Sequence, residues 1–315
     1  MVGKADRRAK DKDVDIDSVN IGKWYKAPSD RIYLVIVYVV LALFMIIVLI
    51  PLLFIVASSF SSAQAIAAGK VLFWPVDFSL EGYKMIMRTP SITTGFINSV
   101  FYTVVGTCIS LALTMLMAYP LTRKDFKASS PLSIMLLVTM FFNGGMIPTY
   151  LLVKNMGMMD TIWAILLPTA MSAYNVILTR TYIKSTIPDD LYESASLDGC
   201  GDFRYFLSFV IPLSKTIIAV MALLYGVAIW NSYFNAMMYL TKPDLQPLQL
   251  VLRDILILNM KVGSSNDIQK QQELILFTYL LRYSTIVVSS VPVMVAYPFV
   301  QKYFVKGIMI GAIKG

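Results

Sequence analysis

The chain alternates long apolar runs with shorter polar segments. A bilayer is crossed by about 20 apolar residues. The runs of this length cover roughly residues 32–57, 94–119, 131–152, 160–182, 213–240 and 279–300. They are rich in Leu, Ile, Val and Phe without strand-like alternation, and lipid offers no partner to unpaired backbone amides. We therefore predict an all-α, polytopic membrane protein with six transmembrane helices.

The polar segments divide the chain further. Residues 1–30 mix both signs of charge and lack an apolar face, so they are predicted to form a cytoplasmic N-terminal tail. Residues 31–315 form the transmembrane domain, which includes a polar segment at 187–212 and a long outer loop at 241–277. The first run is too long, and begins too late, to be a cleavable signal peptide.

Lysine and arginine predict the orientation. With the N-terminus inside, the inner segments hold eighteen of these residues and the outer segments hold eight. This bias places both termini in the cytoplasm of a bacterial inner or plasma membrane. The net charge of +8 is then an orientation signal and a match to anionic inner-leaflet lipid, so we expect no nucleic-acid partner.

Composition excludes several chemistries. The chain is 57% hydrophobic and only 15% charged, and it has no histidine. His-dependent triads, His–Zn sites and histidine proton relays are therefore excluded. No G-x-x-x-x-G-K-[ST] loop is present for nucleotide. Cys108 and Cys200 lie in different parts of the topology, so no disulfide is expected. We expect no metal, no cofactor and no catalytic residue in this chain.

The segment "IPDDLYESASLDGCGDFRYFLSFVIPLSK" is polar between two apolar runs. Pro188 suits the first position of a helix, with Asp189 and Asp190 at its positive dipole end. Gly199 suits its end, and Asp202 is a candidate cap for a second helix. An apolar stripe is expected on that second helix at Phe203, Phe206, Leu207 and Val210. On these grounds alone, an interfacial hairpin lying in lipid is as good an interpretation as a compact knob that meets a partner.

The spacing resembles a known motif. Glu193, Ala195, Gly199 and Pro212 fit E-A-A-x(3)-G-x(9)-I-x-L-P, with Ser194 in place of the first alanine. This pattern is similar to the cytoplasmic signature of ABC-importer permeases. The stretches 141–168 and 230–256 resemble carbohydrate-uptake permeases of the MalG type, within an LplC/YtcP-like group. The resemblance covers roughly residues 30–315.

The resemblance implies a role for the polar segment. In that family it is a pair of coupling helices that sits in a cleft of a separate ATPase dimer, which binds the ATP and Mg²⁺. It implies a second permease, an extracytoplasmic solute-binding protein near 241–277, and inward transport of an oligosaccharide or other carbohydrate by alternating access. We expected Leu191 and Ala195 to form the docking face. The residues assigned to coupling are Leu191, Glu193, Ala195, Asp198, Gly199 and Pro212.

Sugars bind to amides and aromatic faces that are screened from lipid. We expected Trp230, Phe234, Met237 and Met238 to share one helix face, and Asn231 and Asn235 to lie on another. The candidates for the substrate pathway are Asn143, Asn175, Trp230, Asn231, Tyr233, Asn235 and Tyr239. The competing interpretation is structural, since asparagine often joins membrane helices and tryptophan often anchors at the interface.

Two other function classes compete with this interpretation. An ion-coupled secondary transporter usually needs a carboxylate in the middle of a span, and the runs hold scarcely one. A membrane-embedded enzyme would need a convergent set of reactive side chains, which the sequence does not offer. The sequence therefore favours an ABC-importer permease.

Overall fold

The computed structural model describes residues 28–261 and 268–312, and most of the expected N-terminal tail lies outside them. The described secondary structure is helical, without strands, which confirms the all-α class. The helices are α1 (Pro28–Ser59), α2 (Ala63–Ala67), α3 (Glu81–Arg88), α4 (Pro90–Ala118), α5 (Ser129–Phe141), α6 (Met146–Asn155), α7 (Trp163–Leu166), α8 (Ala173–Thr186), α9 (Asp189–Leu197), α10 (Asp202–Tyr205), α11 (Ile211–Leu213), α12 (Lys215–Trp230), α13 (Phe234–Tyr239), α14 (Leu248–Lys261) and α15 (Ile268–Ala312). Tighter or wider turns occur at Pro120–Thr122 (3-10), Phe206–Val210 (π) and Pro243–Leu245 (3-10).

The chain forms two compact units, residues 1–53 and residues 54–315. The described part of the first unit is the apolar stretch of α1. The last turn of α1 belongs to the second unit, where Ala57 is buried in a cluster with Ile66 of α2 and Leu280 of α15. The ring of Phe54 meets the ring of Tyr283 edge-on at 5.6 Å. Every arrangement described from here on lies within the second unit.

In the described part of the chain, three helices are long and apolar enough to cross a membrane. They cover Asp30–Ser59, Pro90–Thr122 and Ile275–Pro298. Two more candidate spans arise if bent helix pairs count as one: α5 meets α6 at 114°, and α10–α11 meets α12 at 79°. The first of these breaks occurs at Gly144 and Gly145, as expected, and Gly145 has a φ of 88° that favours glycine.

Besides the run that breaks at Gly144 and Gly145, two further expected spans are not continuous helices. Residues 160–182 divide between α7 and α8, with Pro168 in the connection. Proline lacks an N–H and disfavours a helical residue before it, so the apolar run does not continue as one helix. The run 213–240 also breaks, because α12 ends at Trp230 and α13 begins at Phe234. Apolar length alone was therefore a poor guide to helix continuity here.

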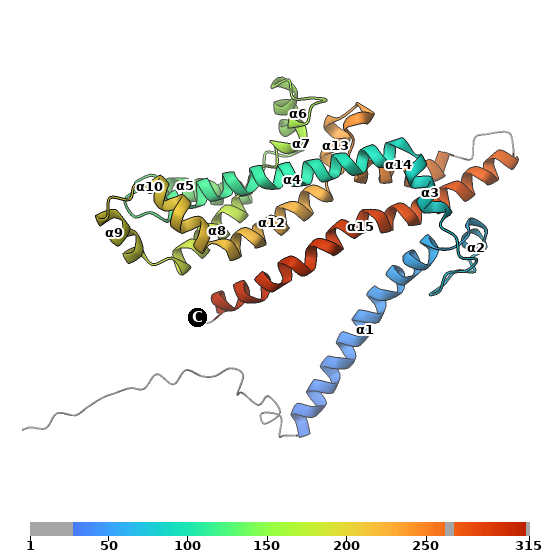
Figure 1. Ribbon diagram of the computed structural model, residues 1–315, viewed down its shortest axis with the longest axis horizontal. Helices are drawn as coiled ribbons and strands as arrows, with labels where there is room; N and C mark the ends of the chain where they lie inside the picture. The colour runs from blue at the N-terminus through green and yellow to red at the C-terminus, as the bar shows by residue number, and fades with distance from the viewer. Residues whose placement is uncertain (1–27, 262–267, 313–315) are drawn as a thin grey trace, which may run out of the picture. The chain divides into compact units, whose positions relative to one another are not determined.

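Helix α4 is the centre of the second unit. It packs along α12 and also contacts α8 and α14, while α12 packs along α15 (Figure 1). Small and hydroxyl-bearing residues on its buried side allow this close packing. A Cβ at Gly95 would lie 3.2 Å from the backbone of Leu248, and one at Gly106 would lie 2.8 Å from the side chain of Ile229.

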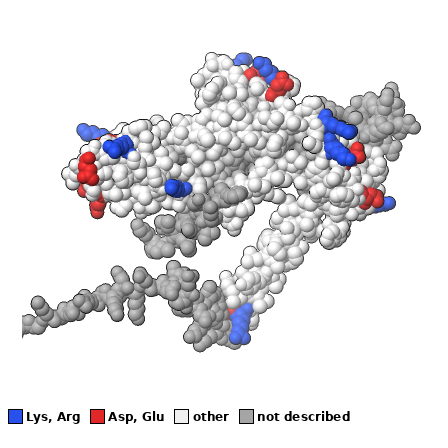
Figure 2. Space-filling view, viewed as in Figure 1, with Lys and Arg blue, Asp and Glu red and all other residues white. Residues whose placement is uncertain are grey.

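Charge is unevenly distributed over the second unit. On the face drawn in Figure 2, charged side chains gather near α9 and α10 and, at the other end of the bundle, near the first turns of α4. A third group lies on the projection that contains α6, α7 and α13. Helix α4 carries no charged residue, and α12 carries only Lys215. An uncharged zone between charged ends is what a lipid-embedded helical bundle requires.

A clasp at Asp160 joins the α6–α7 connection to the segment after α13. The Asp160 carboxylate accepts hydrogen bonds from the backbone N–H of Thr241 at 2.5 Å, from the Thr241 hydroxyl at 2.7 Å and from the backbone N–H of Lys242 at 3.1 Å. Its own N–H donates to the carbonyl of Tyr239 at 3.0 Å. Asp160 has a φ of 56°, which is uncommon for a residue other than glycine.

Candidate functional site

The polar segment that the sequence singled out, residues 187–212, folds as α9 followed by a second helix that begins with α10, and we name it the elbow (Figure 1). Its first helix, α9, begins after Pro188, which is the N-cap rather than the first helical residue that we expected. Asp189 and Asp190 lie in the first turn, as predicted. Acidic side chains there stabilise a helix because its N-terminal end carries partial positive charge.

Gly199 ends α9 as predicted. It has a φ of 77°, and the N–H of Cys200 donates to the carbonyl of Ala195 at 2.9 Å. The N–H of Gly199 donates to the carbonyl of Ser196 at 3.0 Å. This pair of bonds is a Schellman motif, which satisfies the last carbonyls of a helix and requires a left-handed residue. The bend of the elbow is therefore determined by glycine at this position.

The second helix does not begin as we expected. Gly201, not Asp202, is the N-cap of α10, and no side chain caps the helix there. Asp202 is the first helical residue, and its carboxylate instead accepts a hydrogen bond from the hydroxyl of Tyr192 at 2.8 Å. The two helices of the elbow are thus joined by a side-chain bond as well as by the glycine turn.

The apolar stripe predicted for the second helix was only half right. Phe206 and Val210 are buried, but Phe203 and Leu207 are exposed. The π-helical turn at Phe206–Val210 widens the helix and shifts the faces within it, which accounts for the exposed Leu207 but not for Phe203, which precedes the turn. Tyr205 is buried in place of the exposed positions.

Aromatic rings attach the elbow to the end of α4. The ring of Tyr205 meets the ring of Tyr192 edge-on at 5.0 Å and stacks on the ring of Phe209 at 5.2 Å. The ring of Tyr119, just after α4, lies 5.3 Å from the ring of Phe206. These side chains share one buried cluster with residues of α8, among them Ile183. The elbow is therefore packed on the bundle and is not a separate hairpin.

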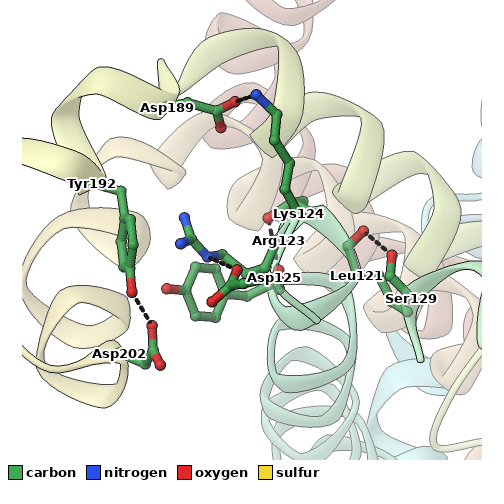
Figure 3. Close-up of polar contacts among 10 residues, drawn as sticks. Leu121, Arg123, Lys124, Asp125, Ser129, Asp189, Tyr192 and Asp202 are labelled. Atoms are coloured by element: carbon green, nitrogen blue, oxygen red, sulfur yellow. Dashed lines mark hydrogen bonds and ion pairs between the residues drawn. The ribbon is translucent and has the colours of Figure 1, made fainter. Parts of the chain in front are cut away.

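Polar contacts reinforce this attachment through the connection between α4 and α5 (Figure 3). The guanidinium carbon of Arg123 lies 3.2 Å from the ring centroid of Tyr192. Arg123 Nε is 3.3 Å from a carboxylate oxygen of Asp125, and Lys124 Nζ is 2.6 Å from a carboxylate oxygen of Asp189. A cation over an aromatic face contributes about 1 to 2 kcal/mol when it is partly desolvated. The Lys124–Asp189 pair is mostly exposed and is the weaker contact.

The same connection is held from its other side. The carbonyl of Leu121 accepts hydrogen bonds from Arg180 Nε at 2.9 Å and from the Ser129 hydroxyl at 2.8 Å. Leu121 itself is buried. The turn after α4 is thus fixed by α5, α8 and α9 together, and a movement of α9 has a short route to α4.

Ionisation in the elbow follows from its hydrogen bonds. The bond to Asp189 raises the pKa of Lys124, and the same bond lowers the pKa of Asp189. The bond that Tyr192 donates to Asp202 raises the pKa of Tyr192, because it stabilises the protonated phenol. Near neutral pH, Lys124 is therefore cationic, Asp189 anionic and Tyr192 neutral.

The exposed face of the elbow differs from the face that we expected. Ala195 is buried against this chain's own core, and Leu191 is partly buried against the same cluster. Neither is placed on the open surface of the elbow, because both lie on the side of α9 that packs on the bundle. Glu193 and Ser194 are exposed, and Leu197 is 90% exposed.

Two other residues assigned to the elbow are also at the surface. Asp198 caps the end of α9 and is exposed, and Pro212 is exposed within α11. A Cβ added at Gly199 would meet no atom within 4 Å, so this position is open on its outer side.

A groove with a volume of about 460 Å³ lies between α4, α12 and α15. Trp230 lines it, and the indole N–H donates to the carbonyl of Ser289 at 2.9 Å. Thr103 and Thr107, one helical turn apart on α4, also line it, and their buried hydroxyls have no hydrogen-bond partner among the described residues. The remaining lining is almost wholly apolar.

The other candidate pathway residues do not gather at this groove. Asn143 is exposed at the α5–α6 break, where its side-chain oxygen accepts from the N–H of Gly145 at 2.9 Å. Asn175 is buried within α8. Asn231 is exposed and donates to the carbonyl of Val227 in its own helix at 2.9 Å.

The last three candidates lie beyond α12. Tyr233 is exposed, Asn235 is half-buried, and Tyr239 is buried and stacks on Tyr150 at 6.3 Å. The shared faces that we predicted across residues 230–239 do not form, because the helix breaks after Trp230.

Sequence reasoning missed the residues that attach the elbow. Arg123, Lys124 and Tyr192 were not among the candidates, because each is unremarkable as a single residue in a polar segment. A weak signal was present: two basic residues follow directly after the α4 run, and a tyrosine lies among acidic residues in α9. Thr103 and Thr107 were also missed, although two hydroxyls at i and i+4 in an apolar span point to one polar face.

Comparisons with known proteins identify this architecture. Residues 126–310 match the family described as "Binding-protein-dependent transport system inner membrane component". The chain belongs to this family of inner-membrane permeases. It is 38% identical over 294 residues to the polygalacturonan/rhamnogalacturonan transport system permease protein YtcP of Bacillus subtilis, a match that covers 91% of this chain and 100% of YtcP. It is also 38% identical to protein LplC of the same organism, over 85% of this chain and 90% of LplC.

A solved structure agrees with this assignment. A chain from a bacterial ABC transporter involved in the import of the acidic polysaccharide alginate superposes with a TM-score of 0.79 at 32% identity, covering 88% of this chain and 98% of that chain. The permease is thus a membrane subunit of an ABC importer with the type I permease fold, as the motif at 187–212 predicted. The comparisons give no support to the ion-coupled alternative.

Proposed function

We propose that this permease carries an oligosaccharide or another carbohydrate inward by alternating access, and that the elbow couples the transport to a separate ATPase. The observation that carries the coupling is the geometry of the elbow. It is a compact helix–glycine–helix unit, packed on the ends of α4 and α8, whose outer face combines the polar Glu193 with the exposed Leu197 and Phe203. A compact unit of this kind transmits the movement of a partner to the helices behind it.

The exposed elbow residues have distinct roles in this proposal. Glu193 forms an ion pair with a basic side chain of the ATPase, and the exposed side chain of Leu197 enters an apolar part of its cleft. Gly199 lets the ATPase backbone approach closely, since a glycine presents no side chain there. Ala195 and Leu191 act from inside, because they hold α9 on the bundle.

The covalent route from the elbow runs through α10 and α11 into α12. These helices meet α12 at an angle of 79°, at Ser214. Pro212 lacks an N–H, so the carbonyl four residues before it has no helical donor, which favours a bend near this point. We propose that closure of the ATPase dimer on ATP swings α12 about this bend and opens the permease outward, and that hydrolysis reverses the movement.

The partners follow from this proposal. They are a second permease, a cytoplasmic ATPase dimer that holds ATP and Mg²⁺, and an extracytoplasmic solute-binding protein that approaches the loop 241–277. Both termini lie in the cytoplasm, which the excess of lysine and arginine near the elbow end supports. The carbohydrate class is supported by the substrates named for YtcP and for the alginate importer.

The groove beside α4 supplies part of the substrate pathway. Trp230 and the buried hydroxyls of Thr103 and Thr107 lie in its wall, and in this proposal they become accessible to a sugar when α4 and α12 separate. This combination of an apolar wall with a few polar groups is typical of small-ligand sites.

The test is sugar-stimulated ATP hydrolysis in reconstituted complexes that contain the binding protein, both permeases and the ATPase. Glu193→Ala and Gly199→Asp are compared with wild type. Two matched controls lie far from the elbow in sequence: Glu81→Ala removes an exposed carboxylate, and Gly69→Asp alters a glycine with a φ of 66° and no neighbour within 4 Å.

We expect Glu193→Ala and Gly199→Asp to lose stimulated hydrolysis or ATPase retention, and both controls to behave as wild type. Aspartate is among the residues that tolerate a left-handed backbone best, so Gly199→Asp is expected to fold. Wild-type hydrolysis and sugar import by both elbow variants would overturn the coupling role and leave the elbow as a structural part of the bundle.

A further inference from the structure

Besides the ring contact between Tyr119 and Phe206, the elbow has a non-covalent contact with the turn after α4 at Arg123. This residue follows the 3-10 turn after α4 in extended conformation. Only 17% of its side chain is exposed, whereas the neighbouring Lys124 side chain is 82% exposed. A charged side chain so largely buried needs partners that compensate for the lost water. Its partners therefore indicate what it does.

The aromatic face of Tyr192 is the nearest partner. The guanidinium carbon lies 3.2 Å from the centroid of that ring. Arg123 Nε is also 3.3 Å from Asp125, so the charge is partly balanced within its own turn. Arginine is suited to this position because a planar, weakly hydrated guanidinium stacks on a ring better than an ammonium does.

Tyr192 is itself held on three sides. Its hydroxyl donates to Asp202 of α10 at 2.8 Å, its ring edge meets Tyr205 at 5.0 Å, and its face receives Arg123. It therefore joins α9, α10 and the turn after α4 at one point, as Figure 3 shows for Tyr192, Asp202 and Arg123. If α9 rotates, either the Arg123 side chain moves with it or the ring of Tyr192 separates from the guanidinium.

A small cavity beside this contact adds to the case. It has a volume of about 20 Å³ and is lined by Arg123, Tyr119 and Tyr205, among others. The hydroxyls of both tyrosines are buried and find no hydrogen-bond partner among the described residues. A space of this size accommodates one water molecule when two or more polar groups face it. The contact between the elbow and α4 is thus polar at its centre and apolar around it.

We propose that Arg123 is a positioning residue for coupling: through the ring of Tyr192 it holds α9 on the end of α4, so that a movement of the elbow reaches α4 as well as α12. This inference rests on the proposed coupling function of the elbow. The covalent route through α11 leads directly to α12 and not to α4, and the groove that Thr103 and Trp230 line is formed between these two helices and α15. The groove opens and closes in step with the ATPase only if both helices follow the elbow.

The test measures the amount of sugar imported per ATP hydrolysed in the full reconstituted complex, together with ATPase retention. Arg123→Gln and Tyr192→Leu remove the two sides of the contact, and Arg123→Lys keeps the charge without the planar group. Tyr192→Phe keeps the ring and loses only the bond to Asp202. Lys124→Gln is the matched control, since it breaks a neighbouring but exposed ion pair.

We expect Arg123→Gln and Tyr192→Leu to retain the ATPase and to lower sugar import per ATP at least about fivefold, the effect of losing a contact of this class. The double variant should be no worse than either single variant, because both remove the same contact. Arg123→Lys should fall between Arg123→Gln and wild type, while Tyr192→Phe and Lys124→Gln should stay within about twofold of wild type.

A wild-type ratio of import to hydrolysis in an assembled Arg123→Gln complex would overturn the inference. If the Arg123→Gln complex does not assemble, Arg123→Lys is the deciding variant. A wild-type ratio of import to hydrolysis in Arg123→Lys would then overturn the inference. The two proposals fail separately. If Gly199→Asp loses coupling and Arg123→Gln couples normally, only the role of Arg123 is wrong. If both variants couple normally, the proposed function of the elbow is wrong as well.

Discussion

The elbow and the Asp160 clasp both join segments that are distant in sequence, and both contain a left-handed residue, but they differ in chemistry. The elbow has glycine at that position, with φ 77°, and presents open space on its outer side. The clasp has aspartate, with φ 56°, whose carboxylate accepts three hydrogen bonds from the opposing segment. Glycine at the left-handed position leaves space for a partner molecule. Aspartate in the same backbone conformation instead forms hydrogen bonds with another segment of this chain.

The two regions also differ in what they bury. The elbow packs aromatic rings against the bundle and the largely buried Arg123, and leaves Glu193 and Leu197 exposed. The clasp is exposed and depends on hydrogen bonds to one carboxylate. In the proposed coupling, the elbow moves as one body against the ATPase, whereas the clasp holds two loops of this chain together.

The largest difference in sugar import is expected between two variants of the left-handed residues, Gly199→Asp and Asp160→Gly. Gly199→Asp is expected to lower sugar import more than about tenfold, because a charged side chain in a close interface is as disruptive as the loss of a central contact. Asp160→Gly is expected to leave import within about twofold of wild type, since the clasp is not on the coupling route. Import by reconstituted complexes measures both, and equal losses in the two variants would contradict the division of roles.

Thermal stability should separate the variants of Asp160. Asp160→Ala loses the acceptor and keeps an unfavourable left-handed backbone, so its unfolding midpoint should be the lowest of the series. Asp160→Gly loses the acceptor but relieves the backbone, so its midpoint should lie between Asp160→Ala and wild type. Thermal unfolding of the purified permease measures this order. If Asp160→Gly were the less stable of the two, backbone strain would play no part in the clasp.

The clasp should also weaken in acid. The hydrogen bonds from Thr241 lower the pKa of Asp160. A carboxyl group whose pKa is lowered by folding stabilises the protein above its unfolded pKa, and this contribution is lost as the pH falls through the folded value. The stability difference between wild type and Asp160→Asn should therefore be constant near neutrality and should shrink below about pH 4. A difference that is unchanged at pH 3 would mean that the charge of Asp160 is unimportant.

The smallest effect is expected at Lys124. Its ion pair with Asp189 lies on the elbow, but both side chains are mostly exposed, so solvent screens it. Lys124→Gln should change the unfolding midpoint by no more than about one degree and should leave import at the wild-type level. A loss comparable to that of Arg123→Gln would show that the exposed ion pair, and not the ring contact, holds α9.

Much of the site could be predicted because its signals are local. Asp189 and Asp190 at the start of α9 and Gly199 at its end act on the backbone within a few residues, so their spacing was enough. The second helix was less predictable. The π-helical turn at Phe206–Val210 changed which side chains are buried, and nothing in a regular helical period announces such a turn.

The sequence by itself determined the apolar composition of the helices, the break at Gly144 and Gly145, and the permease motif at 187–212 with its turn at Gly199. Each of these depends on solvation or on backbone geometry that neighbouring residues impose. Only the tertiary structure decided that Ala195 faces inward, that Trp230 ends its helix beside a groove on α4, and that Arg123 lies over the ring of Tyr192. These contacts join residues dozens of positions apart, and their energies exist only once the helices have packed.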